Sequence, residues 1–305
     1  MEAAVAAAVR ELAACGVAPS AAEVAALRRE VAVRLVTAAL AATRRGIGNA
    51  EPGVDPACYA AAREAAGERP LLSAAGDATA LRLFRAGAPV VLPAACDGAP
   101  LHRELVRLAA TGRMALTAQA ATGTRSDRTA WLSEAEADAA GLPALGAAIR
   151  SLKALTAELN AAGGDRRVVP ARAQVAAFAA DDAGGYVPHW DATSLPPPHQ
   201  PGAFTNRRRA AAVIYACAPD WEQRRDGGCL RCHVGAPSPA GLDGDAQAAI
   251  KAAAAQPGGP PWRFVDVAPL AGRCVVFSAT GLLHQVLPAR RERYAVTLWS
   301  YAPLE

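Results

Sequence analysis

The chain has 305 residues, of which 52% are hydrophobic and 20% are charged. This length and apolar content allow one large or two ordinary domains with a buried core, which excludes a disordered protein. The formal net charge of +4 is small and the arginines are scattered, so no nucleic-acid-binding surface is indicated. No apolar run reaches about 18 residues, and we therefore expect no membrane span.

The seven cysteines favour a reducing compartment. Five of them lie alone among apolar residues, and an odd total does not suit a disulfide framework. Glu2 stands where a secretory signal would carry a basic residue. We therefore expect a protein of the cytoplasm or the nucleus.

The first 78 residues are helical in character. Ser20 and Glu23 form a capping-box pattern, and apolar residues follow at helical spacing from Val24 to Val36. Shorter helices are expected over 58–66 and 78–85. We expect residues 1–78 to form a helical N-terminal extension and residues 79–305 to form the main domain.

Helices give way to strands along the main domain. Two amphipathic helices are predicted over 101–111 and 145–162, and short β-branched or aromatic runs follow after residue 170. These predicted strands cover 173–180, 211–218, 228–234, 273–279 and 293–301. Two stretches, 193–202 and 236–261, are rich in Pro, Gly or Ala and predict surface insertions or mobile loops. This order of elements predicts an α+β domain with a sandwich or small barrel.

The stretch GGCLRCHVG holds Cys229, Cys232 and His233 in the C-x-x-C-H spacing of c-type haem attachment. A cytochrome would need export and a distal axial ligand in a small helical domain, whereas this motif lies in strand-like sequence. A zinc site would need a further Cys/His pair at finger spacing, and none follows. As a strand, the stretch has Leu230 and Cys232 on one face and Cys229 on the other.

Two other histidines offer a different site. His189 and Asp191 lie two apart in GYVPHWD, so on an extended strand both project from the same face. His284 follows an apolar strand, and Arg293 lies nine residues later. Two His and one carboxylate on adjacent strands would form the facial triad that holds Fe(II) with open positions. The Arg293 guanidinium would be a bidentate partner for a co-substrate carboxylate.

Together these pieces resemble the Fe(II)- and 2-oxoglutarate-dependent prolyl 4-hydroxylase family, and within it the branch of the hypoxia-inducible-factor prolyl hydroxylases. GYVPHWD resembles its iron-binding strand, APDW followed by GGCLR its next hairpin, and HQVLPARRERYAVTLW its distal His, co-substrate Arg and terminal Trp. Upstream, GAPVVLPAAC and RSDRTAWL resemble the family's first strand and the segment that closes over the pocket. The resemblance covers about residues 87 to 303.

The resemblance implies a double-stranded β-helix, or jelly roll, supported by helices. It implies that His189, Asp191 and His284 are the iron ligands, that Arg293 binds the distal carboxylate of 2-oxoglutarate, and that Leu230 packs against the chain of that co-substrate. Other residues that it places at the pocket are Tyr186, Thr297 and Trp299, on the co-substrate side, and Trp131, on the substrate side.

Two positions depart from the family's pattern. Where close relatives place a Tyr whose hydroxyl supports the co-substrate carboxylate, we expect Ala216, with Tyr215 beside it. One hydrogen bond to a charged group, worth about 1.5 to 3 kcal/mol, would then be missing unless Thr297 or a water replaces it. A second pocket Tyr is replaced by Phe178.

The implied activity is hydroxylation of a prolyl residue in a protein or peptide, with Fe(II) as cofactor, 2-oxoglutarate and O2 consumed, succinate and CO2 released, and ascorbate in support. No nucleic-acid or membrane partner is expected. Three alternatives stay open: a 2-oxoglutarate oxygenase acting on a non-prolyl or small-molecule substrate, a binding module of the same fold without catalysis, and a c-type haem protein built on Cys229, Cys232 and His233.

Overall fold

The computed structural model describes residues 87–117, 123–163, 169–180, 184–192, 206–240, 242–256 and 262–302, together with Ser20, Ala21, Val24 and Phe84. The chain divides into two units, Met1–Val54 and Asp55–Glu305. In the first unit the backbone N–H of Val24 donates to the carbonyl of Ser20 at 2.9 Å, a helical contact at the predicted capping box. The rest of the expected extension over 1–78, with its helix at 58–66, and the expected loop at 193–202 lie outside the described residues.

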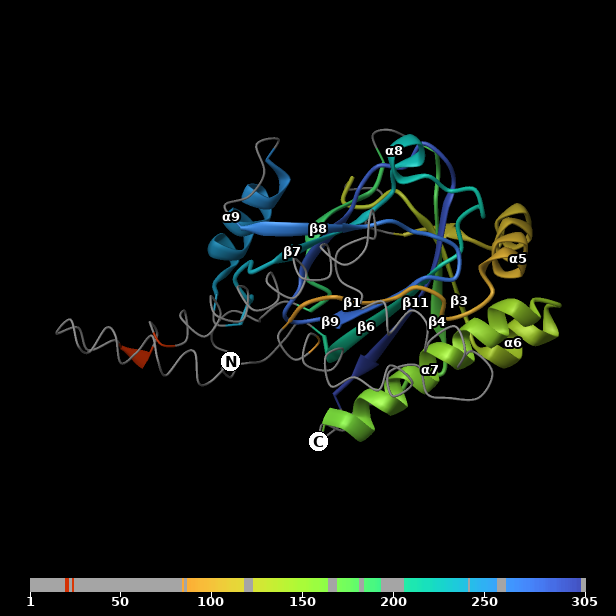
Figure 1. Cartoon of the computed structure of the whole chain (residues 1–305), viewed down its shortest axis with the longest axis horizontal. Helices are drawn as coiled ribbons and strands as arrows, with labels where there is room; N and C mark the ends of the chain where they lie inside the picture. The colour runs from red at the N-terminus through yellow and green to blue at the C-terminus, as the bar shows by residue number, and fades with distance from the viewer. Residues whose placement is uncertain are drawn as a thin grey trace, which may run out of the picture. The chain divides into compact units, whose positions relative to one another are not determined.

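Two antiparallel β-sheets build the second unit (Figure 1). The larger sheet contains, in spatial order, β1 (Val90–Leu92), β9 (Cys274–Ser278), β6 (Arg208–Tyr215), β11 (Arg293–Tyr301), β4 (Ala173–Phe178), β3 (Arg128–Leu132) and β2 (Ala115–Leu116). The smaller sheet contains β5 (Tyr186–His189), β10 (Leu283–Val286), β7 (Leu230–Val234) and β8 (Arg263–Val267). Two antiparallel sheets with a few helices agree with the expected α+β class and are consistent with a jelly roll.

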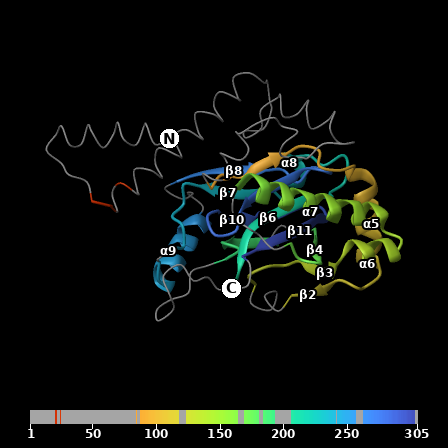
Figure 2. The same cartoon turned by 90° about the horizontal axis from the view of Figure 1, so that it is seen from below.

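Five described helices accompany the sheets: α5 (Gly98–Ala110), α6 (Glu134–Ala139), α7 (Pro143–Gly163), α8 (Gln223–Asp226) and α9 (Gly244–Ala255). Helix α7 runs across the larger sheet (Figure 2). None of the helices in the described part of the chain is long and apolar enough to cross a membrane.

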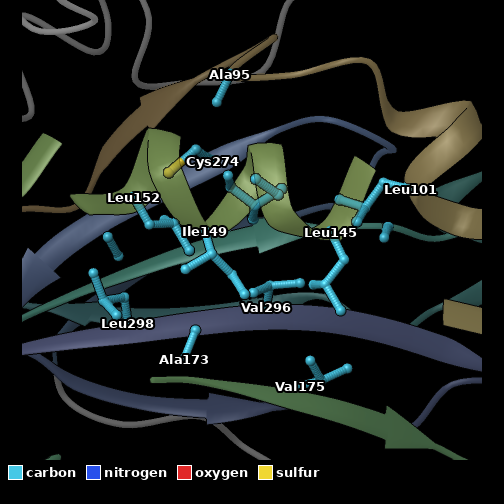
Figure 3. Packing of buried hydrophobic residues seen from close by; sticks show 14 of the residues in the cluster. Ala95, Leu101, Leu145, Ile149, Leu152, Ala173, Val175, Cys274, Val296 and Leu298 are labelled. Carbon is cyan, nitrogen blue, oxygen red and sulfur yellow. The ribbon is translucent and has the colours of Figure 1, made fainter. Parts of the chain in front are cut away.

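The main hydrophobic core lies between α7 and the larger sheet. Leu145, Ile149 and Leu152 follow one another at helical spacing and point from α7 toward Val296 and Leu298 of β11 (Figure 3). All five side chains are at most 1% exposed. Burial of each such side chain contributes about 1.5 to 3 kcal/mol, so this cluster holds β11 firmly in the sheet.

The predicted helices at 101–111 and 145–162 and the five predicted strands are present, with ends shifted by a few residues. The expectation of a loop over 236–261 was wrong in part, because α9 lies within it. Its N-terminus is capped by Asp243, whose carboxylate accepts a hydrogen bond from the backbone N–H of Ala246 at 2.7 Å. The alanines that obscure the apolar pattern of this stretch are themselves strong helix formers.

Glu136 connects helix α6 to Arg172, which directly precedes β4. Its carboxylate accepts hydrogen bonds from the backbone N–H of Ser133 at 2.8 Å and from Nε of Arg172 at 2.9 Å. These bonds favour the charged form and lower the pKa of Glu136 to about 2.

A depressed carboxyl pKa stabilises the fold above the unfolded-state pKa, and that stabilisation is lost as pH falls toward the folded-state value. We therefore predict that Glu136→Gln lowers the free energy of unfolding above about pH 5 and that its difference from wild type shrinks toward about pH 2. Denaturant unfolding at a series of pH values measures this difference. A difference that stayed constant over that range would contradict the prediction.

Candidate active site

The smaller sheet brings the three predicted metal ligands together. His189 ends β5 and pairs with His284 of β10, so both side chains lie on one face of the sheet. Asp191 follows two residues after His189, and its Oδ1 lies 3.8 Å from Nε2 of His189 and 3.9 Å from Nε2 of His284. The three ligand atoms lie within 4.8 Å of one another. One metal ion can bridge atoms at this spacing.

Backbone carbonyls orient both imidazoles. Nδ1 of His189 donates to the carbonyl of Val187 at 2.7 Å, and Nδ1 of His284 donates to the carbonyl of Leu282 at 3.0 Å. Because Nδ1 carries the hydrogen, the lone pair of each ring is on Nε2, the atom nearest Asp191. Burial, and then the neighbouring His284, lower the pKa of His189 well below its usual value and keep the ring neutral. Neutral imidazoles with one carboxylate fit a 2-His-1-carboxylate iron site.

Aromatic rings pack against these imidazoles. The ring of Tyr186 stacks on His189, with centroids 3.6 Å apart and planes inclined by 21°. The ring of Phe277 lies 4.6 Å from that of His284. The guanidinium of Arg125 lies 4.8 Å from the centroid of the Tyr186 ring. The imidazole rings of His189 and His284 therefore have little rotational freedom.

A pocket lined by residues of both sheets opens beside the ligands. The predicted co-substrate residues Tyr186, Leu230, Thr297, Trp299 and Arg293 all line it. Its apolar walls are formed by Ala176, Phe178, Val213, Leu230, Phe277, Val286 and Ala295. The structure thus places the predicted metal ligands and the predicted co-substrate residues around one cavity.

Arg293 supplies a buried positive charge to this pocket. The residue is 2% exposed, and its Nε donates to the carbonyl of Gly228 at 2.8 Å. The guanidinium lies 5.1 Å from the ring centroid of Phe178 and 5.0 Å from that of Tyr215. No carboxylate among the described residues lies within ion-pair distance of it. A buried guanidinium without a carboxylate is costly, so this end of the pocket suits an anionic ligand.

Tyr215 lies beside Arg293 and corrects the expectation made for Ala216. Its fully buried hydroxyl has no hydrogen-bond partner among the described residues, and it lines the pocket. Ala216 lies instead in the core cluster, with Ile214. Alternation along this part of the chain explains the outcome, because Val213 and Tyr215 face the pocket while Ile214 and Ala216 face the core. A tyrosine therefore does line the pocket, at position 215, next to the alanine where its absence was expected.

The outer end of the pocket is aromatic. Trp131, predicted to contact substrate, does not line the cavity; it is 43% exposed, and its ring centroid lies 5.8 Å from that of Trp299. The guanidinium of Arg208 lies 3.8 Å from the centroid of the Trp299 ring, and the buried Nε1 of Trp299 has no hydrogen-bond partner within the described part of the chain. Trp131 is therefore reachable from solvent next to a residue of the pocket wall.

Sequence reasoning did not single out Arg125 and Gln174, which also line the pocket. Nε of Arg125 donates to the buried carboxylate of Asp127 at 2.5 Å, and a terminal nitrogen of Arg125 lies 3.4 Å from Oε1 of Gln174. An isolated β-bridge joins Arg125 to Tyr186. Arg125, the first residue of RSDRTAWL, was visible in the sequence, but its bridge to Tyr186 of β5 is a long-range contact that no local pattern indicates.

The C-x-x-C-H stretch forms β7 and the residue before it. Cys229 and Cys232 are 3% and 0% exposed and three residues apart on extended backbone, so they project from opposite faces. They cannot both reach the edge of one porphyrin, and the haem interpretation finds no support here. Cys232 is buried, but it does not line the pocket, whereas Leu230 does.

Residues 173–301 match the sequence model of the 2OG-Fe(II) oxygenase superfamily. The fold is similar to that of a prolyl hydroxylase from Trichoplax adhaerens, solved with a hypoxia inducible factor oxygen degradation domain peptide fragment, at 18% identity and a TM-score of 0.54 over 73% of this chain and 87% of that one. No protein with a curated description matches the chain.

Two further solved structures were matched at lower TM-scores. One is a prolyl-4-hydroxylase from Pseudomonas putida, at 21% identity and a TM-score of 0.49, covering 74% of this chain and 99% of that one. The other is HygX from Streptomyces hygroscopicus with nickel and 2-oxoglutarate bound, at 13% identity and a TM-score of 0.48, covering 75% and 88%. Residues 173–301, which match the 2OG-Fe(II) oxygenase model, include the three candidate ligands and Arg293.

Proposed function

We propose that this protein is an Fe(II)- and 2-oxoglutarate-dependent dioxygenase that hydroxylates a prolyl residue in a protein or peptide. The observation that carries the proposal is the joint placement of two groups in one pocket. His189, Asp191 and His284 offer a metal three ligand atoms. Arg293 and Tyr215 offer a carboxylate a guanidinium without an acidic partner and a hydroxyl without a hydrogen-bond partner, both counted over the described residues.

In this proposal His189, Asp191 and His284 hold Fe(II) from one side. When bound, the metal supplies open coordination positions at which 2-oxoglutarate and O2 react, so that one oxygen atom enters succinate and the other enters the substrate, with release of CO2. The chain itself contributes orientation, since the carbonyls of Val187 and Leu282 fix the two imidazoles.

Arg293 and Tyr215 bind the distal carboxylate of 2-oxoglutarate. The guanidinium neutralises the carboxylate charge, and the phenol donates one hydrogen bond to it. Leu230, Val213 and Thr297 lie along the same pocket and would enclose the methylene chain. Apolar walls keep water away from the reacting groups, which limits side reactions.

A substrate residue carried on a peptide chain fits the outer end of the pocket. Trp131 presents an exposed ring beside Trp299, and Tyr186 borders the metal ligands. Aromatic faces of this kind pack well on a prolyl ring. The resemblance of GYVPHWD and HQVLPARRERYAVTLW to prolyl hydroxylases supports the same choice. A reductant such as ascorbate would maintain the metal as Fe(II).

Removal of one ligand tests the metal site without turnover. We predict that His284→Ala abolishes binding of Mn(II), added in place of Fe(II), because two protein ligands cannot replace three. Titration calorimetry measures the binding. The matched control is His102→Ala on α5, whose Nδ1 donates to the carbonyl of Ala216 away from the ligands, and it should bind Mn(II) as wild type does. Unchanged binding by His284→Ala would contradict the assignment.

Tyr215 provides a test of the co-substrate site. Tyr215→Phe removes one hydrogen bond to a charged group, worth about 1.5 to 3 kcal/mol, so we predict that KM for 2-oxoglutarate rises about 10- to 100-fold while kcat changes less. Steady-state succinate assays measure both constants. Tyr294→Phe is the control, because Tyr294 belongs to the core cluster, and its KM should stay near the wild-type value. Equal KM values for all three proteins would refute the role of Tyr215.

The activity itself is tested by incubating the protein with Fe(II), 2-oxoglutarate, ascorbate and an array of proline-containing peptides. We predict succinate formation coupled to addition of one oxygen atom to a prolyl residue, read by mass spectrometry. Succinate formed without any modified proline would favour the second candidate, a 2-oxoglutarate oxygenase acting on another residue or on a small molecule. Absence of succinate with every peptide and in their absence would count against an oxygenase.

A further inference from the structure

The turn between β6 and β7 carries the carbonyl that Arg293 contacts. Helix α8 ends at Asp226, and Gly227 and Gly228 follow with φ of +68° and +70°. The carbonyl of Gly228 accepts the hydrogen bond from Nε of Arg293 at 2.8 Å. A Cβ added at Gly228 would lie 3.2 Å from Cδ of Arg293, so the turn packs directly against this side chain. The position of the turn therefore sets the position of the guanidinium.

Asp226 closes this turn on itself. Its side chain is 2% exposed and accepts hydrogen bonds from the backbone N–H of Glu222 at 2.8 Å and from Nε of Arg225 at 2.8 Å. The Arg225 guanidinium holds the pKa of Asp226 well below its usual value, so the carboxylate is charged at neutral pH. A buried carboxylate with a backbone donor and a guanidinium donor makes a rigid connection between the ends of α8.

Asp226 also joins the turn to the segment that leads into β11. Its backbone carbonyl accepts from the N–H of Arg290 at 2.9 Å, and its carboxylate accepts from the guanidinium of Arg291 at 3.3 Å. Next to it, the N–H of Gly228 donates to the carbonyl of Pro288 at 2.8 Å. Arg291 lies two residues before Arg293. The Asp226 carboxylate therefore binds both the turn that carries the Gly228 carbonyl and the segment that leads to Arg293.

We propose that Asp226 is a positioning residue for Arg293 and thereby sets the affinity of the pocket for the distal carboxylate of 2-oxoglutarate; this rests on the proposed function. Arg293 has no carboxylate partner among the described residues, and its Nε is anchored only where Gly228 places a carbonyl. Without the Asp226 charge, the hydrogen bonds from Glu222, Arg225 and Arg291 are weakened and the turn is no longer fixed. The Arg293 guanidinium is then no longer held toward 2-oxoglutarate. Asp226 is not among the residues that line the pocket, and the hydrogen bonds that its carboxylate accepts reach none of the three candidate metal ligands.

The test is Asp226→Asn, which keeps the size of the side chain but removes its charge. We expect Kd for 2-oxoglutarate, measured by calorimetry with Mn(II) in the metal site and without O2, to rise roughly tenfold, as for other residues that orient a ligand-binding group. KM for 2-oxoglutarate should rise in parallel, while the Mn(II) affinity and kcat at saturating 2-oxoglutarate stay near wild type. A residue that only stabilised the fold would not produce this separation.

Asp220→Asn is the matched control, because Asp220 belongs to the same ion cluster but is 68% exposed and accepts from Arg291 on its outer side. We expect its Kd for 2-oxoglutarate to change by about twofold or less. If Asp226→Asn does not fold, as judged by thermal unfolding, Arg291→Gln is tested in its place. This variant removes only the contacts of the Arg291 guanidinium. We expect it to raise the Kd for 2-oxoglutarate as well.

A folded Asp226→Asn protein with the wild-type Kd for 2-oxoglutarate would overturn the inference. If Asp226→Asn is unfolded, the wild-type Kd for 2-oxoglutarate in Arg291→Gln would overturn it. Failure of the proposed function is seen separately, because wild-type protein would then bind no 2-oxoglutarate and form no succinate. A parallel loss of Mn(II) affinity in Asp226→Asn would also overturn the inference, since it would indicate general damage to the site.

Discussion

The pairing of His284 with His189 across β10 and β5 is the constraint on which the rest of the site depends. A slip of one residue would turn one imidazole to the opposite face of the sheet and separate the ligands. Gly185 allows β5 to take this register, because a Cβ there would lie 2.4 Å from the carbonyl oxygen of Val286 in β10. On its other side β10 pairs with β7, which brings Leu230 opposite Val286 and into the same pocket. The candidate metal ligands and the proposed co-substrate wall are therefore positioned by the register of one strand, β10.

The two faces of β11 connect this site to the core of the domain. Val296 and Leu298 pack against α7, while Arg293, Thr297 and Trp299 alternate with them and line the pocket. Burial of a guanidinium costs free energy, and the apolar packing on the opposite face of the same strand offsets that cost. The packing of α7 thus supports Arg293, which the proposed function assigns to binding of 2-oxoglutarate.

The sequence was sufficient to predict the five strands and to single out His189, Asp191, His284 and Arg293, which the structure brings to one pocket, because each depends on local alternation or on a short motif. The resemblance pointed to Ala216 at the position of the pocket tyrosine, but Tyr215 is the residue of this pair that lines the pocket, because neighbouring residues of a strand face opposite sides. Helix α9 was obscured because alanine fits either face of a helix and leaves no apolar stripe. The contact of Arg125 with Tyr186 joins residues 61 positions apart, which no local pattern reveals.

The buried thiols have a consequence for the durability of such an enzyme. Burial raises the pKa of Cys217 to about 11, and it raises the pKa of Cys232 and Cys274 as well, so almost none of these sulfurs is present as thiolate. The described pocket wall contains aromatic rings, among them Tyr186 and Trp299, but no sulfur. Under the proposed function, an oxidant released there in the absence of substrate would meet ring and aliphatic carbon and no sulfur in the described wall. Damage to this wall would then take the form of hydroxylated side chains, which reductants of disulfides cannot repair.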